Sequence, residues 1–269
     1  MMHRRSLLTG MLTLAGTSLI GRAHASTLES VRQQGFMRIA TTGANAPYSF
    51  LDADGTLTGF DLEWSRLICK GLGVEPRFSY LSWSGILPGL MAGQYDAVMS
   101  AVRVTPERKA SFVFSEPYCT DSAAVIVRAD NTSIHEVEGL HGLTIGVASG
   151  SILEDVAHNQ AKPGTLRSYP GLPDIIMDVM SGRLDAGIVG RGGAQYAIRQ
   201  QQVPLKLVGR EIDPHPLAMI LPSGSATLAA AISEQIRARQ ANGQAKSLSN
   251  HWFLSLIHIS EPTRLALIS

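Results

Sequence analysis

The segments Met91-Ala-Gly-Gln-Tyr-Asp-Ala-Val-Met99 and Met180-Ser-Gly-Arg-Leu-Asp-Ala-Gly-Ile188 share one pattern. Each ends an apolar helical face, stops at a glycine, passes through Asp-Ala and begins a β-like run. The strand and glycine turn of Ile39-Ala-Thr-Thr-Gly43 return in the same way in Ile145-Gly-Val-Ala-Ser-Gly150. These repeats predict two similar α/β lobes.

Strands and helices are expected to alternate around the first repeat, over residues 37–42, 61–71, 77–81, 86–91 and 96–101. Asp61 is predicted to cap the first turn of its helix. Such alternation predicts a parallel sheet with helices on its faces. Because ligands bind beyond the carboxyl ends of the strands in open α/β sheets, two facing lobes predict one shared cleft.

The composition is that of a soluble globular protein with one or two cored domains, since 45% of the 269 residues are hydrophobic and 17% charged. Lys+Arg number 23 and Asp+Glu 22, so the clustered positive charge that nucleic acid or an anionic membrane demands is not expected. Two cysteines are too few for a disulfide framework, and the histidines lack metal-ligand spacing. We expect no cofactor, no metal and no nucleic-acid partner.

The first 25 residues read as a secretory signal peptide. His3-Arg4-Arg5 gives a basic start, a short apolar run follows, and Ala23-His24-Ala25 is an A-x-A cleavage site. The apolar run is shorter than the roughly 20 residues that span a bilayer, which favours cleavage over anchoring. The arginine pair also fits a twin-arginine signal, so ordinary secretion and twin-arginine export both stay open.

The last 16 residues, 254–269, read as a non-native tail, because residues 254–264 resemble a translated sequencing adapter. Without the two ends the chain has 228 residues, with 19 basic and 21 acidic side chains. The sequence therefore predicts a mildly acidic secreted protein.

The mature chain resembles the family of extracellular solute-binding proteins, family 3, which serve polar amino-acid ABC importers. The resemblance covers about residues 28–253 and rests on several collinear motifs, one of which departs from the family pattern at Trp64. The motifs are Ala46-Pro-Tyr-Ser-Phe50, Gly59-Phe-Asp-Leu-Glu-Trp-Ser-Arg-Leu-Ile-Cys-Lys-Gly-Leu72, Ile86-Leu-Pro-Gly-Leu90, Tyr95-Asp-Ala-Val-Met-Ser100, Thr105-Pro-Glu-Arg108 and Phe114-Ser-Glu-Pro-Tyr118.

The resemblance implies a type II periplasmic binding protein fold, with two α/β lobes joined by crossover strands near residues 118–127 and 207–217. Lobe 1 would comprise residues 26–120 and 214–253, and lobe 2 residues 121–213. The implied function is capture of an amino acid, an amino-acid derivative or a related small carboxylate by hinge closure in the periplasm. A monomeric binding protein would then deliver the solute to the membrane permease of an ABC importer.

Arg108 is the first candidate ligand contact. Thr105-Pro106-Glu107 reads independently as a helix start, with Thr as N-cap and Pro at the first helical position. A guanidinium beside free backbone N–H groups suits a carboxylate. In the family, the arginine at this position binds the ligand's α-carboxylate. The alternative is a surface arginine paired with Glu107 or Glu116.

Trp83 aligns with the aromatic residue that stacks on the ligand in the family, and Asn45 and Tyr48 flank the first turn of the cleft. Trp83 and Tyr48 both have a second interpretation as core residues of lobe 1. Ser100 and Ala101 lie where the family presents hydrogen-bonding groups to the ligand.

Ser151 follows the second glycine turn and begins a helix expected over residues 152–159. A helix start that faces the cleft suits an anion, so Ser151 is a candidate ligand contact. The alternative is that Ser151 simply caps the helix.

Two departures from the family pattern bear on the ligand. Gly190 stands where the family has an aspartate that accepts the ligand ammonium, and Arg191 follows it; Arg103 replaces a small polar residue beside the carboxylate site. We therefore expect an amino-acid derivative or an organic anion rather than a cationic amino acid. The alternative is that both arginines face solvent and that Asp121 or Glu154 accepts the amine.

An enzyme is the competing interpretation of the chain. Cyclohexadienyl dehydratases, which act on prephenate or arogenate, share the implied fold and need an acid in the cleft. Glu154 lies shortly after Ser151 and is the candidate for that acid. The binding protein remains the favoured function, with no catalytic residue.

Overall fold

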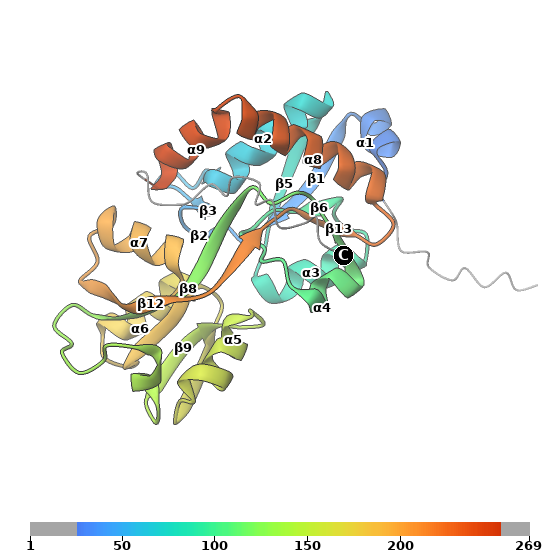
Figure 1. The fold of residues 1–269 in the computed structure, drawn as a ribbon. Coiled ribbons are helices and arrows are strands. Elements are labelled where there is room, and N and C mark those ends of the chain that lie inside the picture. The colour runs from blue at the N-terminus through green and yellow to red at the C-terminus, as the bar shows by residue number, and fades with distance from the viewer. Residues whose placement is uncertain (1–25, 254–269) are drawn as a thin grey trace, which may run out of the picture.

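The protein is built of two lobes, as the computed structural model shows for residues 26–253 (Figure 1). The predicted signal peptide and the predicted non-native tail lie outside the described residues. Two five-stranded sheets are present, one in each lobe. The long strands β8 (Cys119–Arg128) and β12 (Leu205–Leu217) run between the lobes, where the sequence predicted the crossovers. The α/β fold with two crossover strands is confirmed.

Lobe 1 is organised around a sheet with the strand order β5-β1-β6-β13-β7. β1 is parallel to β5 and β6, whereas β13 returns from the end of the chain and runs antiparallel to β6 and β7. The bounds are β1 (Phe36–Thr41), β5 (Glu75–Tyr80), β6 (Ala97–Val98), β7 (Phe112–Phe114) and β13 (Ile220–Pro222). The expected strand over residues 96–101 is therefore shorter than predicted, because the backbone turns away into the cleft after Val98.

The helices of lobe 1 come from both ends of the described chain. They are α1 (Leu28–Gln34), α2 (Phe60–Leu72), α3 (Trp83–Met91), α4 (Pro106–Ser111), α8 (Ala226–Ala241) and α9 (Gln244–Phe253). A small antiparallel sheet of β2 (Ala44–Asn45), β3 (Ser49–Leu51) and β4 (Leu57–Thr58) completes the lobe. No described helix combines the length and apolar character that a membrane span needs.

Lobe 2 has the strand order β10-β9-β11-β8-β12. Its remaining strands are β9 (Thr144–Ala148), β10 (Thr165–Tyr169) and β11 (Ala186–Gly190). Its helices are the 3₁₀ turn η1 (Val137–Leu140), α5 (Leu153–Val156), the π turn η2 (Ala157–Ala161), α6 (Leu172–Met180) and α7 (Arg191–Arg199). The predicted lobe boundaries, after residue 120 and at residue 214, fall inside β8 and β12 and stay predictions.

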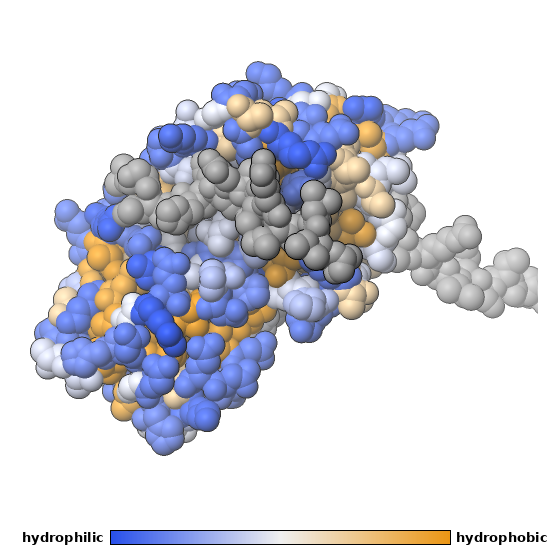
Figure 2. Space-filling view, in the orientation of Figure 1, coloured by the Kyte–Doolittle hydropathy of each residue, from blue (hydrophilic) through white to orange (hydrophobic). Residues whose placement is uncertain are grey.

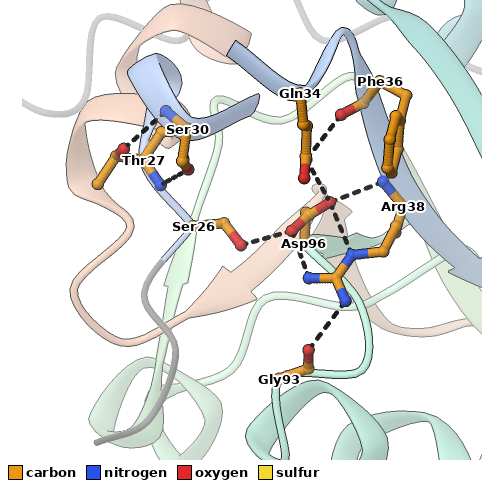
Figure 3. Close-up of polar contacts among 8 residues, drawn as sticks. All are labelled: Ser26, Thr27, Ser30, Gln34, Phe36, Arg38, Gly93 and Asp96. Carbon is orange, nitrogen blue, oxygen red and sulfur yellow. Dashed lines mark hydrogen bonds and ion pairs between the residues drawn. The ribbon is translucent and has the colours of Figure 1, made fainter. Parts of the chain in front are cut away.

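The Asp-Ala repeats have a common structural role, which Figure 3 shows for Asp96. Its carboxylate accepts the backbone N–H of Arg38 on β1 at 2.7 Å and the guanidinium of the same residue at 2.8 Å. In lobe 2, the carboxylate of Asp185 accepts the backbone N–H of Thr144 at the start of β9 at 2.8 Å. Each aspartate therefore ties the loop before its strand to the neighbouring parallel strand, which explains why the pattern recurs.

Asp96 is the more demanding of the two aspartates because it is almost fully buried. Burial opposes its ionisation, but hydrogen bonds from Arg38 and from the Ser26 hydroxyl outweigh burial and lower the pKa of the carboxyl group. The ion pair between Asp96 and Arg38 joins the loop before β6 to β1 in the sheet of lobe 1.

The core of lobe 1 is rich in aromatic side chains. Trp64, where the family pattern has a smaller residue, is completely buried and lies edge-on to Phe60, with ring centroids 6.4 Å apart. Its ring also lies 6.0 Å from that of Tyr118, at the approach to β8. The apolar core thus extends from α2 to the first crossover. On the face seen in Figure 2, hydrophilic residues dominate and apolar residues show mainly on lobe 2.

Candidate functional site

A cavity of about 130 Å³ lies between the lobes, beyond the carboxyl ends of the strands. This space exceeds several times over the roughly 10–15 Å³ that admits a single water, so it has room for a small solute. Lobe 1 supplies the turn after β1, the start of α3, the loop after β6 and α4, and lobe 2 supplies the turns after β9, β10 and β11. The predicted shared cleft is present.

Eight of the ten candidate contacts line this cavity together. They are Asn45, Trp83, Ser100, Ala101, Arg103, Arg108, Ser151 and Gly190. The structure does not place Tyr48 or Arg191 among the lining residues.

Arg108 is held in position by the start of α4. The Thr105 hydroxyl accepts the Arg108 backbone N–H at 3.3 Å, and Pro106 occupies the first turn, as the sequence predicted. Nη1 of Arg108 donates to the carbonyl oxygen of Arg103 at 2.9 Å. No carboxylate of the described residues forms an ion pair with Arg108, and Glu116 pairs with Arg237 instead. The other guanidinium donors are thus available to a solute.

The Arg108 guanidinium lies 5.2 Å from the centroid of the Trp83 ring, within the range of a cation–π contact. Burial, followed by the charge of Arg103, lowers the pKa of Arg108 to about 10. The group stays protonated at neutral pH, so the cavity presents a desolvated positive charge that favours an anionic group.

Trp83 also connects the two lobes. Its Nε1–H donates to the carbonyl oxygen of Gly150 in lobe 2 at 2.9 Å. The rings of Phe50 and Tyr196, which also belong to different lobes, lie 6.0 Å apart. These contacts describe a closed cleft. Trp83 packs partly against the core of lobe 1 as well, so both interpretations of this residue apply in part.

Ala101 occupies a left-handed backbone conformation with φ 47°, which costs free energy for a residue with a Cβ atom. The conformation is held by Asp61, whose Oδ2 accepts the Ala101 N–H at 2.7 Å. Oδ1 of the same carboxylate accepts the Tyr118 hydroxyl at 2.8 Å. The predicted capping role of Asp61 is wrong, because Gly59 is the N-cap of α2 and the carboxylate turns inward.

Ser100 is joined to Thr42, a lining residue that the sequence analysis missed. The Ser100 hydroxyl accepts the Thr42 backbone N–H at 3.1 Å, and the two side-chain oxygens lie 3.0 Å apart. This pair adds neutral hydrogen-bonding groups to the lobe 1 wall.

Asp121 is the acidic side chain of the cavity. It lies on β8, and Ala123, two residues further along, pairs with Gly190 on β11. Side chains two residues apart share one face of a strand, so the Asp121 side chain occupies the space beside Gly190. A Cβ atom on residue 190 would lie 2.8 Å from Asp121 Oδ2. The glycine thus leaves room for the Asp121 carboxylate in its present position.

The Asp121 carboxylate is only partly satisfied. Oδ1 accepts the Gly192 backbone N–H at 3.0 Å, while Oδ2 lies 3.7 Å from Nη2 of Arg103, beyond hydrogen-bond distance. Burial raises the pKa of Asp121 against the charge of Arg103, the backbone N–H groups of Gly192 and Ser122, and the nearby Tyr48 hydroxyl.

Arg103 also faces the cavity rather than solvent, with its side chain 8% exposed. Its backbone bridges Leu217 at the end of β12. Its Nη1 atom is buried and has no hydrogen-bond partner among the described residues. A buried guanidinium donor without an acceptor costs free energy.

Two sequence predictions place residues in the cleft that the structure puts elsewhere. Tyr48 is 1% exposed and packs in the lobe 1 core, with its ring 5.3 Å from that of Phe253. Arg191 begins α7 but turns away, and its Nε lies 3.2 Å from a carboxylate oxygen of Glu211 on β12. The cleft therefore gains positive charge from Arg103 but not from Arg191.

On the lobe 2 side, the helix expected over residues 152–159 is present as α5, which continues directly into the π turn η2. The Ser151 hydroxyl donates to the Ala148 carbonyl at 2.7 Å and accepts the Leu153 N–H at 3.3 Å, so it lines the cavity and also caps the turn. Glu154 does not line the cavity and accepts a hydrogen bond from Ser168 at 2.8 Å.

Most of the lining residues that the sequence analysis missed are apolar or lie in turns. They are Ala44, Ala148, Ile152, Leu153, Pro170, Gly171, Leu172, Ile175 and Val189. The break Pro170-Gly171 directly after β10 is a signal that could have found the third lobe 2 turn. Within residues 26–253 no group of three or more His, Cys, Asp or Glu side chains could hold a metal ion.

Residues 37–255 match the model of the bacterial extracellular solute-binding proteins, family 3. The L-cystine-binding protein TcyJ of Escherichia coli (strain K12) is 29% identical over 253 residues, which cover 93% of this chain and 95% of that protein. The chain thus matches this relative over nearly its full length.

Solved structures give the same picture. The ancestral amino acid-binding protein AncCDT-1, a precursor of cyclohexadienyl dehydratase, superposes with a TM-score of 0.80 at 30% identity, covering 85% of this chain and 100% of that one. An ancestral arginine-binding protein bound to arginine gives a TM-score of 0.76 at 28% identity, covering 81% and 98%.

Proposed function

The chain belongs to the bacterial extracellular solute-binding proteins, family 3, and we propose that Arg108 anchors a carboxylate of its solute. The protein is a periplasmic substrate-binding component of an ABC importer that captures an amino acid, an amino-acid derivative or a related small carboxylate. The observation that carries the anchor is a desolvated guanidinium that lines the cavity.

Binding and closure cooperate in this proposal. The free donors of Arg108 form charge-assisted hydrogen bonds with the carboxylate, and closure removes water from around them. Because electrostatic attraction grows as the local dielectric falls, the pair is stronger in the closed cleft. The hydrogen bond from Trp83 to Gly150 then helps to hold the lobes together.

A thermal-shift screen over amino acids, acylated amino acids, opines and dicarboxylates identifies the solute class, because a ligand that binds only the native state raises its melting temperature. The variant Arg108→Ala loses a charged hydrogen bond of about 1.5–3 kcal/mol, so affinity should fall roughly tenfold to 150-fold and the thermal shift at a fixed ligand concentration should shrink by the corresponding amount. Arg199→Ala, which removes an exposed arginine, is the matched control and should keep the shift. A thermal shift in Arg108→Ala as large as that of the unaltered protein would contradict the proposed role of Arg108 as the carboxylate anchor.

The same samples separate a binding protein from a dehydratase. Incubation with prephenate or arogenate should leave both compounds unchanged, because Glu154, the acid expected for the enzyme, lies outside the cavity lining, and the lining acid Asp121 is held by the Gly192 N–H beside Arg103. Turnover of either compound would identify an enzyme on this fold.

We also propose that residues 1–25 export the chain and are removed, and that the mature protein acts as a monomer on its permease. Mass spectrometry of the periplasmic protein should find Ser26 as the first residue. Light scattering at micromolar concentration should give the mass of one chain.

A further inference from the structure

Positively charged side chains outnumber negatively charged ones among the described residues of the cavity lining. Among the described residues that line it, two are positive, Arg103 and Arg108, and one is negative, Asp121. A neutral amino acid would bring equal opposite charges and leave one buried positive charge without a partner. Because unpaired buried charge is costly, a solute with one net negative charge suits the closed cavity better.

The three side chains are also separately available to a solute. Nη2 of Arg103 lies 3.7 Å from Asp121 Oδ2, which is beyond hydrogen-bond distance. Arg103 in turn has a buried Nη1 without a partner among the described residues. Arg108 uses Nη1 for the Arg103 carbonyl and keeps its other donors. The cavity therefore offers one acceptor for an N–H group and two separate donors for anionic groups.

Gly190 makes this arrangement specific to the chain. The glycine removes the side chain that would otherwise end β11, and Asp121 fills the freed space from the neighbouring strand. The carboxylate in the cavity is thus supplied by β8, while its other oxygen is fixed by the Gly192 N–H at 3.0 Å. An ammonium group placed beside Gly190 would meet Oδ2 directly.

We propose that the solute is an amino dicarboxylate, with its ammonium group on Asp121, one carboxylate on Arg108 and the second carboxylate on Arg103. This inference rests on the proposed function of the cleft and specifies its ligand class. In the complex each of the three charged side chains that line the cavity faces an opposite charge on the solute.

Isothermal titration of the purified protein with matched ligands tests the class. L-aspartate, L-glutamate, L-2-aminoadipate and the opine N-(1-carboxyethyl)-L-alanine carry two carboxylates and one amine; L-glutamine lacks the second carboxylate, glutarate lacks the amine, and L-arginine lacks the second carboxylate and carries an extra cation. The best amino dicarboxylate should bind at least tenfold more tightly than each of the last three. Tighter binding of glutamine, arginine or glutarate than of every amino dicarboxylate would overturn the inference.

Two variants assign the groups. Asp121→Asn keeps the shape and should weaken the amino dicarboxylate about tenfold or more while leaving glutarate unchanged or tighter. Arg103→Gln should weaken the amino dicarboxylate by a similar factor and leave glutamine nearly unchanged. Equal losses for all ligands in either variant would contradict the assignment. Should a variant fail to fold, the ligand ranking in the unaltered protein still decides whether an amino dicarboxylate is the preferred ligand.

The outcomes also separate this inference from the proposed function. If glutamine or arginine binds most tightly and Arg108→Ala abolishes that binding, the carboxylate anchor stands and the amino dicarboxylate is wrong. If no ligand depends on Arg108, the anchor itself is wrong.

Discussion

Replacing Asp61 by Asn should change how the stability of the protein depends on pH. Asp61 is completely buried, and its carboxylate accepts the Ala101 N–H and the Tyr118 hydroxyl. Burial raises the pKa of this group from 3.8 to about 7, against the lowering effect of the two hydrogen bonds. Asn preserves the geometry, because its Oδ1 can accept from Ala101 and its amide can donate to the Tyr118 oxygen.

The sign of the effect follows from proton binding. Between about pH 4 and pH 7 the native state holds a proton on Asp61 that the unfolded chain releases, so the free energy of unfolding falls as pH rises through this range. At 1.36 kcal/mol for each pH unit, the rise from 3.8 to about 7 corresponds to about 4 kcal/mol. This contribution is fully present below pH 4 and is lost above pH 7.

Urea unfolding of both proteins across this range measures the effect. The free energy of unfolding of Asp61→Asn relative to the unaltered protein should increase by about 4 kcal/mol from pH 4 to pH 8. Asp96→Asn is the matched control, because its carboxyl has a lowered pKa and its contribution is lost as pH falls below about 4, with the opposite sign. A constant difference between Asp61→Asn and the unaltered protein would refute the reasoning.

Two further predictions follow from contacts between and within the lobes. Trp83→Phe removes the hydrogen bond to Gly150 and, at about 1 kcal/mol for a neutral bond, should weaken solute binding roughly fivefold by calorimetry without lowering the melting temperature of the free protein. Asp96→Ala should cost about 1.5–3 kcal/mol in urea unfolding, because it removes the charged hydrogen bonds that the buried carboxylate accepts from Arg38 and Ser26. Asp185→Ala, at an exposed position, should cost only about 1 kcal/mol; equal losses would contradict the asymmetry between the repeats.

The local part of the site was accessible from the sequence. Thr105 and Pro106 fix the start of α4 through nearest-neighbour chemistry, so the position of Arg108 follows from residues within one helical turn. The repeats placed the turns after β1 and β9 at one cleft because parallel strands with the same pattern end on the same side. Such short-range rules do not need the tertiary fold.

The errors concern partners that are distant in the chain. Arg191 forms an ion pair with Glu211 on the next strand, and the Tyr48 ring packs against Phe253 near the end of the described chain. Asp61 stands where a capping residue would, yet its partners lie 40 and 57 residues away. Side-chain direction at a turn depends on which neighbours are packed against it, and no local pattern carries that information.

Asp121 shows how such distant pairing bears on function. It lies on β8, where it pairs with His215 of β12, and Arg103 bridges Leu217 at the end of the same strand. Asp121 therefore lies on a crossover strand and Arg103 beside one, whereas Ser151 and Gly150 belong to lobe 2 alone. A solute held by Arg103, Arg108 and Asp121 occupies the side of the cleft nearest the hinge. Closure then has only to bring the lobe 2 turns onto a solute already fixed by its charges, and the Trp83 contact stabilises the closed form rather than the first encounter.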